Sequence, residues 1–404
     1  MTKYGRSPWI DRAPASRVPS YPKYRGKTDM DVAIIGGGIV GCTAAYAFAM
    51  AGARVALLEA DRVGRGTTAF SNGWISDDPG ARLADVERVM GLRAARQGWQ
   101  AWRRASLDFI SLIRRLNIKC DLEPCGLLVA ATGGDAVQLL KEQKARKAAG
   151  LGAPALTARA LADEAAINAS SAMRLRDGAT LDPYRATIGL AAAAAARGAQ
   201  IFEKTAVRKT TFNRKIAVVH TAEGSLTVRR VIVATGTPTA LFKSLQRHFW
   251  FKSAYTVVTD KVPGKIRQAL GKRAMVIRDS ATPPHIIRWI DDERIMVNGA
   301  DAEAVIPRLR DKTIVQRTGQ LMYELSTIYP DVSGIQPEYG WESPYALTAE
   351  GLPYFGGHRN FPFHLFAFGD ASHNLTGAYL ASRIFVRNFL DERDPADDAF
   401  TFTR

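Results

Sequence analysis

The chain has 404 residues, 47% of them hydrophobic and 23% charged, a composition that is typical of globular proteins and excludes extended disorder or a fibrous fold. At roughly 100–200 residues per domain, this length predicts two or three domains. The net charge is +16, from 55 Lys and Arg against 39 Asp and Glu, so the surface attracts anions. The basic residues are dispersed and form no nucleic-acid-binding motif, so no nucleic-acid partner is predicted.

Location and metal binding are also constrained. No stretch approaches the ~20 consecutive apolar residues of a membrane-spanning helix, so no transmembrane segment is expected. The three cysteines, Cys42, Cys120 and Cys125, are too few for a disulfide framework and lack zinc-ligand spacing. They fit a reducing compartment, and we expect a cytoplasmic protein without a metal site. The sequence leaves the oligomeric state open.

Residues 1–30 form a separate first segment, rich in Pro, Ser, Arg and Tyr. Its prolines favour extended backbone, and it lacks the apolar core of a secretory signal. Trp9, Tyr21 and Tyr24 give it aromatic surface to bury. We therefore expect an ordered, extended arm that packs along the body of the protein.

A β-α-β unit follows the arm. Residues 31–35 form a continuous apolar run, typical of a strand that is covered on both faces. An alanine-rich helix is predicted up to about Gly52, and residues 54–59 predict a second buried strand that ends in a carboxylate. This is the arrangement that opens a nucleotide-binding fold.

Three glycines between the first strand and the helix carry the chemistry. Gly36 permits a tight turn, Gly38 lets the backbone approach a pyrophosphate, and Gly41 lets the helix pack on the strand. Free N–H groups at the start of the helix would bind phosphate. Glu59, 18 residues after Gly41, would accept hydrogen bonds from ribose hydroxyls and disfavours a 2′-phosphate. The unit therefore predicts a dinucleotide site in which Ile39, Val40 and Ala60 also contact the cofactor.

The later elements combine helices with an antiparallel middle. Helical periodicity covers 82–117, 136–149, 184–197 and most of 302–329, and a last helix runs to about 390. Short strands are predicted at 125–131, 200–202, 206–212, 216–220, 226–229, 230–234, 254–259, 275–278, 285–290, 294–298 and 363–368. Parallel-type strands at both ends and antiparallel strands between them predict a nucleotide domain that is interrupted by an inserted sheet.

Three later segments favour FAD over NAD. The loop 64–73 is rich in Gly, Thr, Ser and Asn and follows the second strand, where it can wrap a pyrophosphate and reach a flavin. A second segment closes a later strand, and a third stands between the last strand and the last helix, whose N-terminus could stabilise a reduced flavin. The expected contacts are Gly66, Thr67, Thr68, Ser71, Asn72 and Gly73 in the first segment, Thr235 and Gly236 in the second, and Gly369, Asp370, Asn374, Leu375 and Thr376 in the third.

These motifs together resemble the D-amino acid oxidase superfamily of FAD-dependent amine oxidoreductases, over about nine-tenths of the chain from Asp31. The dinucleotide glycines with Glu59 and the Gly-Thr-Thr loop carry the resemblance. So do the Leu-Asp-Pro turn at 181–183, the segment 204–207, whose Val207 backbone corresponds to an adenine contact, and the signatures at 340–344 and 350–356.

The resemblance implies an α/β fold with a Rossmann-type FAD-binding domain and an inserted antiparallel-sheet substrate domain. The FAD domain is expected from 31–95, 160–245 and 340–392, and the substrate domain from 96–159 and 246–339. The implied function is oxidation of the C–N bond of an amine or modified amino acid, by hydride transfer to flavin N5, giving an imine. The implied partner is a small-molecule amine.

Several positions depart from the family pattern. Phe70 stands where some relatives attach FAD to a histidine, and the C-terminal signature has no cysteine, so non-covalent FAD is implied. Glu342 and Ser343 stand where α-amino-acid oxidases place an arginine for the substrate carboxylate. The strand 294–298 has no lysine of the kind that activates oxygen, so oxygen is expected to react slowly.

A flavin monooxygenase is the alternative function, because Gly369, Asp370 and His373 also resemble an element of that class. A non-catalytic flavoprotein is a third possibility, supported only by the basic charge. The candidate catalytic residues are His373, Arg288, Glu342 and Tyr255. For each of them a structural role is an equal or stronger alternative: a hydrogen-bonded histidine, a solvated arginine, a carboxylate on the other strand face, or a core tyrosine.

Overall fold

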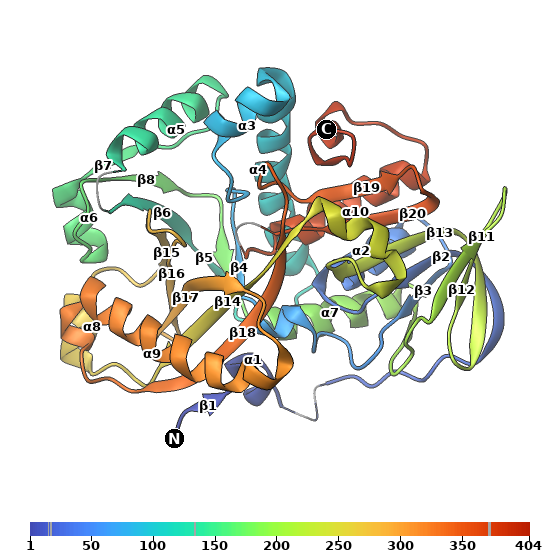
Figure 1. The fold of residues 1–404 in the computed structure, drawn as a ribbon, viewed down its shortest axis with the longest axis horizontal. Coiled ribbons are helices and arrows are strands. Elements are labelled where there is room, and N and C mark those ends of the chain that lie inside the picture. Colours follow the sequence, from blue (N-terminus) through green and yellow to red (C-terminus); the bar gives the residue numbers. More distant parts are fainter. Residues whose placement is uncertain (15, 17, 133–134, 371–372) are drawn as a thin grey trace.

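The computed structural model describes residues 1–14, 16, 18–132, 135–370 and 373–404. Figure 1 shows two large sheets side by side, with helices on their outer faces and between them. Strands from residues 26–58, 200–236 and 354–368 build one sheet, and strands from 126–175 and 250–347, with one from the N-terminal arm, build the other. This division, with a parallel and a mostly antiparallel half, agrees with the expected α/β class.

The first sheet has a parallel core. β10 (Gln200–Phe202), β3 (Val55–Leu58), β2 (Gly26–Ile35), β13 (Gly224–Gly236) and β20 (Phe361–Phe368) run parallel in this order. β12 (Ala217–His220), β11 (Lys209–Phe212) and β19 (Tyr354–His358) extend it with antiparallel pairs. Alternate residues of β2 belong to different cores, since Val32 and Ile34 pack on one face and Ala33 and Ile35 on the other. Burial on both faces explains the continuous apolar run.

The expectation of two separate strands at 226–229 and 230–234 is wrong, because both belong to β13. The first half of β13 pairs with β12 in antiparallel fashion, and its second half pairs with β20 in parallel. The whole strand also pairs with β2. A single strand is therefore shared by an antiparallel part and a parallel part of the sheet.

Helices cover the parallel sheet. α2 (Ile39–Met50) packs against α7 (Pro183–Ala196) and α10 (Thr376–Phe389), and α10 packs on α4 (Leu92–Arg115). The expected helix at 82–117 is two helices, α3 (Leu83–Met90) and α4, because Gly91 between them has a φ of +83°. α7 begins where the Asp182 carboxylate accepts the N–H of Arg185 at 2.9 Å.

The second sheet has nine strands. Their order is β1 (Lys3–Tyr4), β18 (Pro337–Leu347), β14 (Trp250–Thr259), β17 (Arg294–Glu303), β16 (Ile286–Ile290), β15 (Met275–Arg278), β6 (Gly126–Ala131), β8 (Ser171–Leu175) and β7 (Ala155–Thr157). All neighbours are antiparallel except β1–β18 and β15–β6. α9 (Arg310–Ile328) covers one face, and the opposite face turns toward the first sheet.

Smaller elements complete the fold. α5 (Ala136–Ala148), α6 (Ala158–Ala165) and α8 (Gly264–Ala269) lie around the second sheet in Figure 1. β4 (Trp74–Ile75), β9 (Ala179–Thr180) and β5 (Glu123–Pro124) form a three-stranded sheet. The 3-10 helices are η2 (Thr67–Phe70), η3 (Ala240–His248), η4 (Pro307–Leu309), η5 (Pro330–Val332) and η6 (Pro395–Phe400).

The expected domain boundaries differ from sheet membership at two places. β8 and β18 pair within the second sheet, although residues 160–245 and 340–392 are expected in the FAD domain. We propose that the substrate domain also takes in residues 160–175 and 340–347, because a strand shares the core of the sheet in which it pairs.

The described residues of the N-terminal arm are ordered but not uniformly extended. β1 pairs with β18, and α1 (Pro8–Asp11) follows it with a proline in its first turn. Trp9 and Tyr24 are buried, whereas Tyr21 is half-buried. β2 already begins at Gly26, so the arm is shorter than the expected 30 residues.

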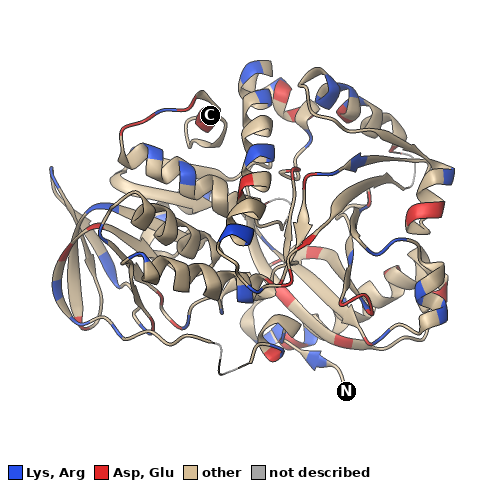
Figure 2. Ribbon diagram, turned by 180° about the vertical axis from the view of Figure 1, so that it is seen from behind, with Lys and Arg blue, Asp and Glu red and all other residues tan. Residues whose placement is uncertain are grey.

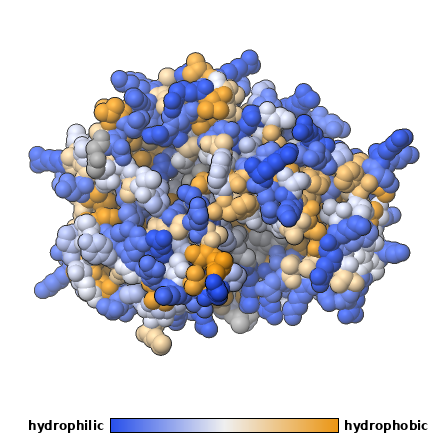
Figure 3. Space-filling model, viewed as in Figure 1, coloured by the Kyte–Doolittle hydropathy of each residue, from blue (hydrophilic) through white to orange (hydrophobic). Residues whose placement is uncertain are grey.

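Charge is distributed over the whole molecule. Figure 2 shows Lys and Arg on helices and loops of both halves, interspersed with Asp and Glu. On the face drawn in Figure 3, hydrophilic residues predominate and apolar ones form separate patches. Within the described parts of the chain, no helix is both long and apolar enough to cross a membrane.

Gly41 provides a test of the contact between α2 and β2. A Cβ on Gly41 would lie 1.9 Å from the carbonyl oxygen of Gly36, so Gly41→Ala must push the helix off the strand end. We expect a loss of about 1–3 kcal/mol in unfolding free energy, or insoluble protein. Urea denaturation of the variant measures this loss of unfolding free energy.

Gly319→Ala is the matched control for this substitution. Gly319 is exposed within α9, and a Cβ there would meet nothing within 4 Å. Alanine should stabilise the helix by roughly 0.5–1 kcal/mol. Equal stability of Gly41→Ala and the natural protein would contradict the close contact.

Candidate active site

A cavity of about 430 Å³ is lined by residues of both sheets. From the first sheet come Leu58, Glu59 and the turn after β2, and from the second come Asn298 and residues 343–346. The start of α10 and the loop before it close another side. The cavity therefore lies at the carboxyl ends of parallel strands, where α/β folds place their ligands.

One end of the cavity is formed by the glycine turn and Glu59. The carboxylate of Glu59 accepts the N–H of Gly37 at 2.6 Å and that of Asp61 at 2.8 Å, which fixes it at the cavity wall. The hydroxyl of Thr68 accepts the N–H of Ile39 at 3.0 Å. Gly38, the N-cap residue of α2, adds no side chain, so the start of the helix is accessible to a ligand.

The structure places most of the expected cofactor residues on the cavity wall. These are Gly36, Gly38, Ile39, Val40, Glu59, Ala60, Gly66, Thr67, Thr68, Ser71, Asn72, Val207, Thr235, Gly236, Gly369, Asp370, Asn374 and Leu375. Three expected residues are not on the wall. Gly41 packs on Gly36, Gly73 holds a φ of +62° beside Leu181, and the hydroxyl of Thr376 donates to Ser76 O at 2.7 Å.

The residues at this end fit a dinucleotide such as FAD. A Cβ on Gly38 would lie 3.0 Å from the hydroxyl of Thr68, so the turn offers bare backbone to a phosphate. The Nδ2 of Asn72 is buried at the cavity wall, and none of the described residues is its hydrogen-bond partner. A buried donor without an acceptor is unfavourable, and a bound cofactor atom would supply that acceptor.

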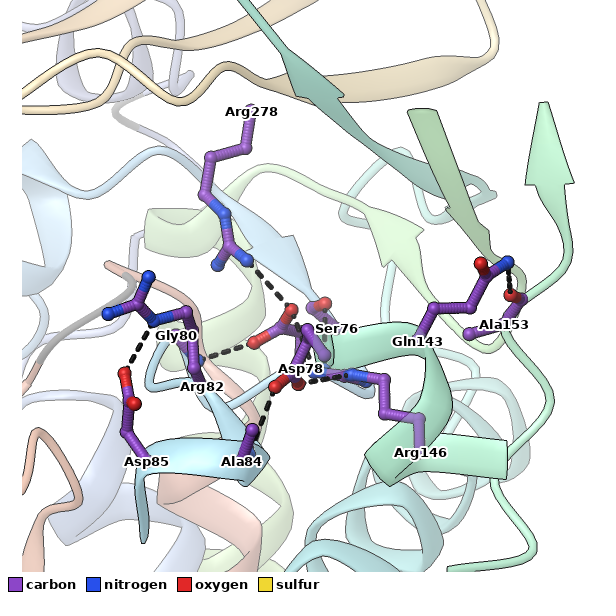
Figure 4. A network of polar contacts seen from close by, with 11 residues as sticks. Ser76, Asp78, Gly80, Arg82, Ala84, Asp85, Gln143, Arg146, Ala153 and Arg278 are labelled. Carbon is purple, nitrogen blue, oxygen red and sulfur yellow. Dashed lines mark hydrogen bonds and ion pairs between the residues drawn. The ribbon is translucent and has the colours of Figure 1, made fainter. Parts of the chain in front are cut away.

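A buried ionic network fixes the loop that borders the cavity at Pro79 (Figure 4). Both arginines of the network donate to Asp78, Arg278 at 2.9 Å and Arg146 at 3.1 Å, and the Asp78 carboxylate also accepts the N–H of Gly80. Burial opposes ionisation of Asp78, but the two arginines outweigh it and hold its pKa below the usual value. The backbone carbonyl of Asp78 accepts from the Asn374 amide, which joins this loop to the start of α10.

The other end of the cavity holds a polar cluster around His373. Its Nε2 lies 3.9 Å from Asp301 and its Nδ1 lies 3.7 Å from Asp370, and its ring meets that of Tyr345 edge to face at 4.5 Å. The Tyr345 hydroxyl donates to the same Asp301 oxygen. Burial lowers the pKa of His373, but the two carboxylates more than offset this and raise it to about 10. His373 is therefore cationic at neutral pH.

Nothing in the sequence pattern singles out Asp301, because a β-bulge places it. Ser253 pairs with Ala302 and Tyr255 with Gly299, so two residues of β17 oppose Ala254 alone. Ala300, in this bulge, has a φ of +50°. The bulge resets the alternation along β17 and brings Asp301 to Tyr345 and His373.

The expectation that Glu342 and Tyr255 border the substrate is not met. Tyr255 pairs with Glu342 in the sheet, and both side chains lie on the face covered by α9. The carboxylate of Glu342 accepts from Ser253 at 2.5 Å and from Arg310 at 2.6 Å. Neighbouring Ser343 lines the cavity instead. Alternation in a strand leaves the choice of face open, and here α9 supplies the cation that Glu342 requires.

Arg288 is buried but does not line the cavity. Its Nη1 donates to the carbonyl of Gly73 at 2.6 Å, and its guanidinium lies 5.3 Å from the ring of Trp9. Burial lowers the pKa of Arg288 to about 10. The sequence predicts that Arg288 is solvated or binds the substrate; instead it is buried and contacts the loop 64–73, called the flavin loop below.

The charge of His373 predicts a pH-dependent stability. Its pKa in the folded protein lies above its ordinary value of 6.5, so this contribution is full below pH 6.5 and is lost as the pH rises toward 10. His373→Asn removes the charge and keeps a residue that tolerates the φ of +51°. We expect the stability difference between natural protein and variant to shrink between pH 6 and pH 10 in urea titrations. A constant difference over this range would contradict the charged cluster.

Comparison with known proteins places the site in context. The family model described as "FAD dependent oxidoreductase" matches residues 31–387. The chain is 25% identical over 379 residues to the gamma-glutamylputrescine oxidoreductase of Escherichia coli, covering 93% of this chain and 87% of the relative. The resemblance expected from the motifs is thereby confirmed.

Two solved structures share the fold. L-proline dehydrogenase from P. horikoshii superposes with a TM-score of 0.75 at 16% identity, over 94% of this chain and 97% of that one. Glycine oxidase from Geobacillus kaustophilus superposes with a TM-score of 0.71 at 20% identity, over 93% and 99%. At these identities the likeness shows the fold alone. None of the three relatives is named as a monooxygenase, so the alternative function gains no support.

Proposed function

The chain belongs to the FAD-dependent oxidoreductase family, and we propose that it oxidises the C–N bond of an amine whose anionic groups, where present, lie away from the reacting carbon. The chemistry that FAD supplies when bound is acceptance of a hydride from the carbon beside the amine nitrogen. Gly36, Gly38, Glu59 and Asn72 are the residues that would hold it. The protein then has to select, orient and shield the amine.

The polar cluster at the far end of the cavity carries this proposal. Asp301 and Asp370 face one imidazolium, that of His373, so the local charge is negative. Among the described residues of the cavity wall, none is Lys or Arg. Such an environment attracts an ammonium group and repels a carboxylate next to the reacting carbon.

Asn298 is the residue that we propose for orienting the amine. Its side-chain NH₂ donates to the Tyr255 carbonyl at 3.2 Å and to the Thr256 hydroxyl at 3.0 Å, which fixes the amide at the cavity wall. The amide oxygen is suited to accept a hydrogen bond from an amine N–H. Buried apolar side chains around the site exclude water from the reacting carbon.

The electron acceptor is the second part of the proposal. On β17 the cavity-facing row contains Met296 and Asn298, and no lysine stands in the strand. A fixed ammonium group would stabilise the superoxide that forms when oxygen takes electrons. We therefore propose slow reaction with oxygen and another physiological acceptor.

A cytoplasmic location, suggested by three free buried cysteines, also belongs to the proposal.

We expect FAD to be bound without a covalent link. Phe70 and Tyr345 line the cavity, no cysteine does so among the described residues, and His373 is protonated and lacks a free lone pair for attack. Acid precipitation of the yellow protein should release FAD into the supernatant, where its absorbance measures it. Colour that stays with the precipitate would contradict non-covalent binding.

The substrate proposal is tested by reduction of the flavin without oxygen. We expect N-alkyl amines and monoacylated diamines to bleach the flavin, and glycine and simple D-amino acids to do so poorly. Asp301 stands behind Tyr345 and His373 and does not itself line the cavity, so Asp301→Asn acts through the charge of the cluster. It should raise the amine concentration for half-maximal bleaching by about tenfold. The exposed Asp311→Asn on α9 is the matched control. Admission of air then measures the reaction with oxygen.

Efficient bleaching by ordinary D-amino acids would sink the substrate proposal. Reoxidation by air as fast as substrate reduction would sink the proposed acceptor. These two outcomes are independent, since one concerns the charge of the cluster around His373 and the other the lack of a lysine in β17.

A further inference from the structure

The loop that carries Ser71 and Asn72 into the cavity is held from behind by side chains. Its carbonyl groups accept three such hydrogen bonds: Phe70 O from the Trp341 indole at 2.9 Å, Ser71 O from the Trp9 indole at 3.0 Å, and Gly73 O from Arg288 at 2.6 Å. Two of these donors lie on the second sheet, on β18 and β16, and the third lies on the N-terminal arm. The loop is thus fixed by three separate parts of the chain.

Trp9 reaches the loop because the arm is anchored on both sides of it. β1 pairs with β18, and the Gly5 N–H donates to Gly340 O at 2.8 Å. α1 then presents Trp9, which is 4% exposed, to the loop, and it packs against η2 and α7 (Figure 1). Arg12 forms an ion pair with Asp291, next to β16. The arm therefore docks on the second sheet rather than on the helices of the nucleotide domain alone.

The burial of Arg288 carries a free-energy cost that the packing around it does not explain. It is 4% exposed, its Nε has no hydrogen-bond partner, and no ion pair of the described chain includes it. A buried cation without a carboxylate destabilises a fold unless another interaction offsets it. Among the described residues, its guanidinium donates to the Gly73 carbonyl and lies over the face of the Trp9 ring, while Asp182, Asp291 and Glu123 act on it from beyond ion-pair distance. The arm and the loop therefore supply its direct polar contacts.

Asn72 is the cavity residue whose position depends on these hydrogen bonds. It stands between Ser71 and Gly73, the residues whose carbonyls Trp9 and Arg288 hold, and its Nδ2 is buried at the cavity wall without a partner. Rotation of either neighbouring peptide would move this amide. A donor is useful to a cofactor only when its position is fixed in advance.

We propose that the N-terminal arm is a working part of the cofactor site, in which Trp9, together with Arg288, sets the position of Ser71 to Gly73 for FAD binding. Both are positioning residues, since neither lines the cavity. The arm precedes residue 31, where the family match begins, so this role is a property of the chain outside the matched region. The proposal needs the FAD assignment and is independent of the choice of amine.

Trp9→Phe tests the role of the indole N–H, because it keeps an aromatic ring against Arg288. We expect the Kd of FAD, from fluorescence quenching during titration of the apoprotein, to rise roughly 2- to 10-fold, the effect of one hydrogen bond. The visible circular dichroism of the bound flavin should change as well, because the loop shifts. Arg288→Gln should act in the same direction.

Trp99→Phe is the matched control. Trp99 is fully buried in the same core, its indole N–H has no partner among the described residues, and it does not line the cavity. It should lower the thermal stability of the apoprotein and leave the Kd of FAD and the flavin circular dichroism unchanged. An equal loss of FAD affinity in both Trp variants, or none in Trp9→Phe, would overturn the proposal.

The natural protein offers a test that needs no substitution. If the arm positions the FAD loop, binding of FAD must in turn stabilise the docked arm, because coupling between two sites is reciprocal. We expect that adding FAD to the apoprotein slows tryptic cleavage within residues 1–25. The factor should be at least as large as the rise in the FAD Kd that Trp9→Phe causes. Cleavage at the same rate with and without FAD would overturn the proposal, whatever the activity of the loaded enzyme.

Discussion

The contact between the start of α2 and the end of β2 is the constraint on which the site depends. A Cβ on Gly41 would lie 1.9 Å from the Gly36 carbonyl oxygen, so only glycine lets the helix begin directly against the strand. That approach points the first turn of α2 into the cavity and leaves Gly38 as an open N-cap. The helix dipole and bare backbone then favour a phosphate group at this point. The carboxylate of Glu59, fixed by the Gly37 N–H, completes the same wall.

The β-α-β unit could be predicted from the sequence because its pattern is local. A strand that is buried on both faces must be apolar throughout, and the glycine turn sets its end within a few residues. The choice of strand face is not local. Glu342 and Ser343 look equally suited to the cavity, and only α9, which brings Arg310 to Glu342, decides which of them faces it. Asp301 depends on a β-bulge, and β13 on partners more than a hundred residues away. Such features follow from long-range packing and leave no periodic signal.

Buried charge shapes the site more than the net charge does. The excess of basic residues is spread over both halves, as Figure 2 shows, and gives no preferred face. Apart from Arg288, the buried charges described above stand in groups that combine both signs. Asp78 is paired with Arg146 and Arg278 and fixes the loop beside Pro79 (Figure 4). The cluster around His373 sets two carboxyl groups, of Asp301 and Asp370, against one imidazolium at the cavity. A fixed local imbalance in a water-poor cavity acts on a substrate far more strongly than screened surface charge does.

The flavin loop is held by side chains that come from distant parts of the chain. A loop that offers side chains to a cofactor turns its carbonyl groups away from it, and those carbonyls need donors. The Gly73 carbonyl accepts a backbone N–H from Leu181 at 2.9 Å, and the side-chain donors to the carbonyls of this loop are the indoles of Trp341 and Trp9 and the guanidinium of Arg288. Indole and guanidinium groups suit this position because each joins a rigid plane to a directed N–H group. Long side chains can come from distant segments, so an arm outside the nucleotide fold can share control of a site within it. The geometry of the cofactor site is therefore set by the assembled halves of the protein together.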